Sequence, residues 1–197
     1  KIKGITLGTH LKVNPFLYGE VSISNLVKRH PINIFFKFFL YLSVILMIAY
    51  WYNYNKIFKK VLNKDINIFY IFGICSAVFL FFHVYFLGST SDNEVLKNFR
   101  RIIIVLFILF EVLAQTLLAF KIFKNRNIFL KYCFRFIVLT KLFFVLSILI
   151  FTIAILTILS IYNLPSSVDY ILEWNYFIVL LVFYLLSSLM WKKIINF

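Results

Sequence analysis

Long, uninterrupted runs of apolar residues alternate with short polar segments along this chain of 197 residues. A helix that crosses the hydrocarbon core of a bilayer, about 30 Å thick, needs about 20 such residues. Because the runs are continuous, they favour membrane-spanning helices over barrel strands, whose polar and apolar residues alternate. Five segments qualify, at about residues 34–54, 66–87, 102–122, 136–161 and 170–191. The sequence therefore predicts an all-α, polytopic transmembrane helix bundle.

Composition leads to the same conclusion, since 63% of the residues are hydrophobic and only 14% are charged. Soluble domains carry about 25% charged residues, and a soluble fold of this length could not bury so much apolar surface. The formal net charge of +14 does not indicate a nucleic-acid partner, because the cations form short clusters between the apolar runs. We expect contact with membrane lipids, including anionic headgroups, and no nucleic-acid binding.

The chain divides into a polar start and one bundle. Residues 1–33 contain glycines, prolines and polar side chains but no span, and we interpret them as a non-cytoplasmic loop ahead of a bundle formed by 34–197. The first residue is Lys1 rather than Met, so we expect one further helix upstream and six spans in the full-length protein. Helix-mediated oligomerisation is left open.

The distribution of charge predicts the orientation. Residues 55–65 and 123–135 and the C-terminus fall on one side of the membrane. With Lys121 at its edge, this side carries eleven of the 21 lysines and arginines and a single acid, Asp65. The positive-inside rule places that side in the cytoplasm. The C-terminus is then cytoplasmic, and residues 1–33 are lumenal or extracellular.

Glu111 is the ionisable residue predicted to lie deepest in the membrane, near the middle of the third span. Ionisable groups at such positions are costly and therefore candidate functional residues. Gln115 follows four residues later and shares the same helix face. Two interpretations remain open. The pair forms a polar patch for a lipid headgroup, a proton or a partner helix, or Glu111 is a protonated side chain that bonds to a neighbouring helix.

A second candidate group is predicted at the non-cytoplasmic end of the bundle. It consists of His83 near the end of the second span, Asp92 and Glu94 in the following loop, and Glu173 at the start of the last span. A histidine with carboxylates can act as acid and base, but the spacing matches no metal motif. We expect neither metal nor cofactor. The structural alternative is that the three acids stabilise helix ends.

Several other residues receive structural interpretations. We expect Tyr50, Trp51, Tyr52 and Tyr54, which end the first span, to form an aromatic belt at the membrane interface. Lys37 and Lys141 lie near span ends and are expected to extend their amines towards the headgroups. Cys75 and Cys133 fall in different environments and indicate neither a disulfide nor a redox motif.

Short motifs distributed along the chain resemble those of a known family. They are Val21-Ser22-Ile23-Ser24-Asn25 with Pro31, the aromatic end of the first span at Ala49-Tyr50-Trp51-Tyr52-Asn53-Tyr54, the turn Gly88-Ser89-Thr90-Ser91-Asp92-Asn93-Glu94, the pair Glu173-Trp174, and the closing Trp191. In these features the chain resembles the Frag/DRAM/Sfk family of six-span proteins. It departs from that family in lacking the first span and in carrying Cys75, Ser76 and Ala77 where some members are more polar.

The resemblance implies a role in lipid remodelling or lipid organisation in the secretory pathway. The Ser- and acid-rich turn and the closing Trp191 are closer to the branch that remodels the lipid of GPI-anchored proteins in the Golgi or endoplasmic reticulum than to the autophagy branch. GPI-anchored proteins are then expected partners. The alternatives are an autophagy or lipid-organising protein, a membrane acyltransferase or hydrolase that uses His83 with Glu173 or Asp92, and a transporter subunit.

Overall fold

The computed structural model describes residues 14–18, 23, 32–62, 67–87, 94–161 and 166–192. In order along the chain, the helices are α1 (Pro15–Tyr18), α3 (Ile32–Leu62), α4 (Ile68–Phe86), α5 (Glu94–Lys124), α6 (Arg126–Phe129), α7 (Arg135–Ile161) and α8 (Ser166–Leu189). Five of them, α3, α4, α5, α7 and α8, are long and apolar enough to cross a membrane. The predicted all-α bundle is confirmed.

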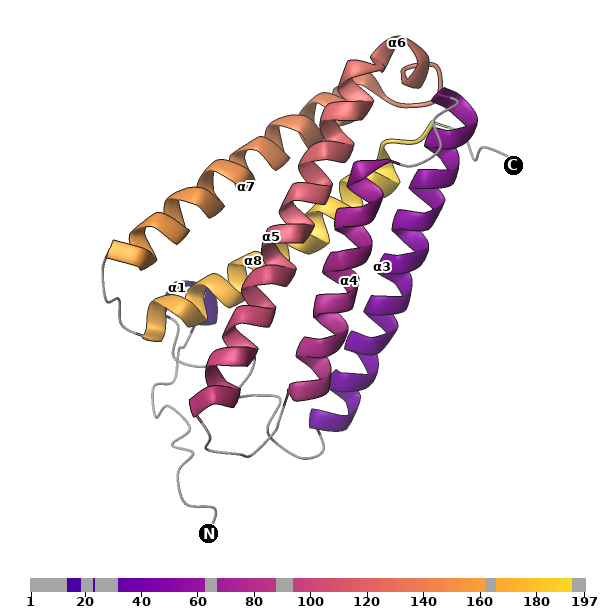
Figure 1. Ribbon diagram of the computed structural model, residues 1–197. Coiled ribbons are helices and arrows are strands. Elements are labelled where there is room, and N and C mark those ends of the chain that lie inside the picture. Colours follow the sequence, from indigo (N-terminus) through magenta and orange to yellow (C-terminus); the bar gives the residue numbers. More distant parts are fainter. Residues whose placement is uncertain are drawn as a thin grey trace.

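Successive long helices run in opposite directions, so the helix termini gather at the two ends of the bundle (Figure 1). Helices α3, α4 and α5 stand side by side, and α7 packs against α5 and α8. Helix α8 runs obliquely behind α5 and α4 and reaches the last turns of α3 (Figure 1). Helix α8 therefore meets α3 and the α4–α5 pair in the interior of the bundle, although these segments are distant in sequence.

One end of the bundle carries most of the described cations, and we call it the basic end. It comprises α6, the last turns of α3, α5 and α8, and the first turns of α4 and α7 (Figure 1). Helix α3 continues about two turns past its apolar stretch and finishes with Lys59 and Lys60, and α5 finishes with Lys121 and Lys124. Cations at these C-terminal ends suit the helix dipole. This is the end that the charge pattern assigns to the cytoplasm.

The connection between α6 and α7 is tied to the C-terminal end of α8. The backbone N–H of Phe134 donates to the Met190 carbonyl at 2.8 Å, and the N–H of Lys192 donates to the Tyr132 carbonyl at 2.7 Å. Cys133, which lies between these bonds opposite Trp191, has none of its surface exposed. The C-terminal end of α8 is thereby fixed to the start of α7.

The interior of the bundle is dominated by aromatic side chains, and the outer surface is apolar. Trp51 and Phe58 of α3 and Phe183 of α8 are 0% exposed. By contrast, Phe136 and Phe143 of α7 are 80% and 76% exposed. A monomer in water rarely presents so extensive an apolar surface. This surface is suited to lipid, and the chain is an integral membrane protein.

Candidate functional site

Glu111 lies at the centre of a buried polar cluster built from three helices. Its side chain is 0% exposed. The amide of Gln115, one turn on in α5, donates to the carboxyl group at 2.8 Å, and the Tyr184 hydroxyl of α8 donates at 2.8 Å. The Ser76 hydroxyl of α4 lies 2.5 Å from the other carboxyl oxygen. Both oxygens of Glu111 therefore have protein partners on α4, α5 and α8.

The local sequence of α4 explains how this cluster is positioned. Gly73, Ser76 and Ala77 are small residues, which allow neighbouring helices to approach closely. A Cβ atom at Gly73 would overlap the indole ring of Trp51 on α3. The indole thus occupies the space that glycine leaves, and its N–H lies beside the Glu111 carboxyl group without a hydrogen-bond partner of normal geometry.

Lys141 of α7 forms a second buried polar cluster. Its amine is 2.7 Å from the Ser187 hydroxyl of α8 and 4.5 Å from the centre of the Phe183 ring. The side chain is only 1% exposed. The expectation that Lys141 extends towards the lipid headgroups is therefore wrong. Ser187 and the ring of Phe183 hold the amine inside the bundle.

Tyr50 connects the two clusters. Its hydroxyl donates to Ser187 at 2.9 Å, and its ring lies 4.8 Å from the ring of Tyr184, centre to centre. The polar groups thus follow one path from Glu111 through Tyr184, Tyr50 and Ser187 to Lys141. No direct ion pair joins Glu111 to Lys141 in the part of the chain that the structure describes. These contacts can hold α3, α5, α7 and α8 in register.

The aromatic belt predicted at the end of the first span is only partly present. Tyr52 is 57% exposed, as expected for a side chain at a membrane interface. Trp51 is 0% exposed and Tyr54 is 5% exposed, so that assignment is wrong for both. The Tyr54 hydroxyl instead accepts from the Trp191 indole at 3.3 Å and joins α3 to the chain after α8.

His83 lies near the end of α4, away from both polar clusters. Its charged neighbour is Arg100 of α5, and its Nδ1 atom is buried without a hydrogen-bond partner. Within the described residues His83 makes no hydrogen bond to a carboxylate, so no acid–base pair with Glu173 is assembled there. Asp92 lies outside the described residues. Glu94 begins α5, and its side chain is likewise outside them.

Glu173 joins the last span to the segment ahead of the first. The backbone N–H of Ile23 donates to its carboxylate at 3.1 Å, across 150 residues of sequence. Beside it the ring of Phe16 in α1 meets the Trp174 indole edge-on, with 5.6 Å between ring centres. The Asn175 side chain also donates to the Phe16 carbonyl at 3.1 Å. We call this contact of residues 16 and 23 with 173–175 the α1–α8 junction.

Possible metal ligands lie scattered over the described ranges. Within them no three His, Cys, Asp or Glu side chains come together as metal ligands. Cys75 and Cys133 are both free thiols. Burial raises the pKa of the Cys133 thiol from 9.0 to about 11. That thiol is therefore a packing group rather than a nucleophile.

Comparison of the chain with protein-family models, with curated proteins and with solved structures found no match.

Of the predicted site residues, the structure brings Glu111 and Gln115 together. It places His83 and Glu173 apart from them. Sequence reasoning missed the roles of Ser76 and Tyr184, which bond to Glu111 from other helices, and of Tyr50, which bonds to Ser187. It also missed Ser187. The serines and Lys141 are polar residues inside apolar runs, and that property was the available signal.

Proposed function

We propose that this membrane protein takes part in lipid remodelling of GPI-anchored proteins in the secretory pathway, at the membrane face opposite the basic end. The observation that carries the proposal is the α1–α8 junction. It brings Ile23, from one of the motifs on which the family resemblance rests, into contact with Glu173 of another, although 150 residues separate them. Motifs that pack together in this way form one structural unit.

The position of the junction agrees with that role. It lies at the start of α8, at the end of the bundle opposite the basic end (Figure 1). The positive-inside rule puts the basic end in the cytoplasm and the junction on the lumenal side. GPI anchors occupy the lumenal leaflet. Residues at this junction are therefore suitably located to contact an anchor or the protein attached to it.

The interior supports a compact lipid-handling protein better than a transporter. Transporters commonly use discontinuous helices whose exposed ends hold the substrate at mid-membrane. Here the five spans are continuous helices. The deep carboxyl group of Glu111 is already bonded to Ser76, Gln115 and Tyr184. We assign this cluster to holding α4, α5 and α8 together, and the lipid-related role to the junction.

A rescue experiment tests the proposal. Cells lacking the full-length protein are supplied with wild type, Glu173→Ala or the control Ile178→Ala, whose side chain lies on the same helix and is 43% exposed. The lipid of GPI-anchored proteins is then measured by mass spectrometry. We expect wild type and the control to restore the anchor lipid and Glu173→Ala to fail at matched expression. Full rescue by Glu173→Ala would contradict the assignment of the junction.

A further inference from the structure

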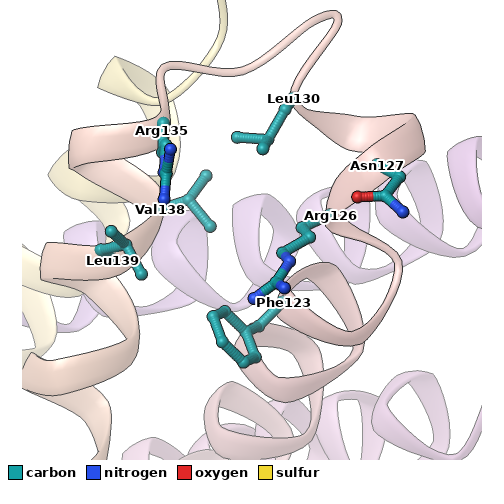
Figure 2. A pocket seen from close by; sticks show the side chains of 7 residues that line it. All are labelled: Phe123, Arg126, Asn127, Leu130, Arg135, Val138 and Leu139. Atoms are coloured by element: carbon teal, nitrogen blue, oxygen red, sulfur yellow. The ribbon is translucent and has the colours of Figure 1, made fainter.

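A pocket of about 310 Å³ opens at the basic end, between the last turn of α5, α6 and the first turns of α7 (Figure 2). Its lining residues are Phe123, Arg126, Asn127, Leu130, Arg135, Val138 and Leu139. Figure 2 shows the two arginines on different walls, Arg126 on α6 and Arg135 at the start of α7. The volume is at the lower end of the range for small-ligand sites, about 300–1,000 Å³.

Among the residues that the structure describes, the lining carries two arginines and no acidic side chain. Among the described residues, no carboxylate pairs with Arg126 or Arg135, and none lines the pocket. The Arg126 guanidinium lies 5.3 Å from the centre of the Phe123 ring, which limits the conformations open to it. Arg135 begins the 27-residue helix α7, whose dipole adds positive potential at the same point. These groups favour an anion that accepts paired N–H donors.

The remaining wall of the pocket is apolar and leads towards the membrane. Phe123, Val138 and Leu139 line it, and Leu139 is 43% exposed on the outer face of α7. Phe136, one turn away, is 80% exposed. The anionic headgroup of a lipid would contact the two arginines, and its hydrocarbon chains would contact the apolar wall. A fully hydrated anion would gain nothing from the apolar wall.

We propose that this pocket binds the phosphate group of an anionic phospholipid in the leaflet at the basic end. Arginine forks match phosphate oxygens in pairs, which a lysine amine cannot reproduce. Asn127 offers an amide donor to the headgroup, and Phe123 and Leu139 contact the first methylenes of the chains. The site lies at the opposite end of the bundle from the α1–α8 junction. The proposed phospholipid binding does not depend on the role in GPI-anchor remodelling.

The test is a binding titration of the purified full chain in detergent with dioctanoyl phosphatidic acid. Parallel titrations use dioctanoyl phosphatidylcholine and inorganic phosphate. The test variant is Arg126→Gln/Arg135→Gln. The matched control is Lys124→Gln/Lys131→Gln, which removes the same charge from exposed side chains of the same end that do not line the pocket.

Wild type should bind phosphatidic acid and discriminate against both other probes. The arginine pair variant should lose about tenfold or more in affinity, because hydrogen bonds to charged groups are the strong ones. The lysine pair variant should stay within roughly threefold, because Lys124 and Lys131 do not line the pocket and act only through screened surface charge. Equal losses in both variants would overturn the proposal, since surface charge alone would then explain binding. Inorganic phosphate bound as tightly as the lipid would overturn the lipid as the ligand.

A further variant guards against a folding defect. Arg126→Lys/Arg135→Lys keeps both charges and removes the planar forks. We expect it to unfold at the wild-type temperature and to bind phosphatidic acid several-fold more weakly than wild type. Wild-type affinity in this variant would contradict paired recognition of the phosphate by the arginines.

Discussion

Replacement of Glu111 by leucine removes the acceptor at the centre of the polar cluster while preserving most of the side-chain volume. Three hydrogen bonds are lost, those to Ser76, Gln115 and Tyr184. Hydrogen bonds between membrane helices contribute about 0.6 kcal/mol each on average and up to about 1.7 kcal/mol. We therefore expect Glu111→Leu to lower the free energy of unfolding by about 2 kcal/mol, and by no more than about 5 kcal/mol.

Glu111→Gln provides the informative comparison. Its amide oxygen can accept from Gln115 and Tyr184, and its NH₂ group can donate to the Ser76 oxygen while the Ser76 hydroxyl donates to the Gly73 carbonyl 2.8 Å away. All three contacts survive, so the cost should stay below about 1 kcal/mol.

Unfolding by sodium dodecyl sulfate in mixed micelles, followed by tryptophan fluorescence, measures all the Glu111 variants. The control is Val105→Ala, at a half-exposed position of the same helix. It should change the unfolding free energy by no more than about 0.5 kcal/mol. The reasoning is refuted if Glu111→Leu matches the control, or if Glu111→Gln is as destabilising as Glu111→Leu.

Three further predictions concern packing and thiol chemistry. Gly73→Ala should cost about 1–3 kcal/mol in the same unfolding assay, because the new methyl group overlaps the Trp51 ring; wild-type stability would contradict this. Ser187→Ala should destabilise more than Lys141→Met does, because it leaves the buried amine without its hydroxyl partner; the reverse order would count against that pairing. Cys133 should resist maleimide in the folded protein at pH 8, since its thiol is buried and its pKa is raised to about 11. The stability that this shift contributes is present below pH 9 and is lost as the pH rises from about 9 to about 11. Mass-spectrometric labelling and unfolding at a series of pH values measure the two effects, and rapid labelling of Cys133 before unfolding would contradict the first.

The helices were predictable because a membrane-spanning helix is specified by consecutive apolar residues, which can be read directly from the sequence. The contact of Glu111 with Gln115 was predictable for the same reason, since residues four apart lie on one face of a helix. The 2.8 Å bond between them confirms that geometry. Because successive spans run in opposite directions, the sequence also predicted which helix ends lie at the same end of the bundle. These inferences require the helical period and the thickness of the bilayer, and nothing more.

The interior partners were not predictable, because they depend on which helix faces meet. The charge of Lys141 and its place near the end of a span suggested an amine at the headgroups. Its burial depends on Ser187, 46 residues away on α8. Trp51 and Tyr54 likewise have the composition of an interfacial belt. They turn inward because Gly73 leaves room for one and Trp191 binds the other. The rotation of each helix about its axis is set by such pairs.

The function proposed here makes the lipid of GPI-anchored proteins the quantity to measure. Cells with and without the full-length protein are compared by mass spectrometry of anchors released from the same surface proteins. We predict an altered chain composition, or loss of the remodelled form, that returns when the protein is restored. Identical anchor lipids in the two cell lines would contradict the proposed role and leave the α1–α8 junction as a packing contact.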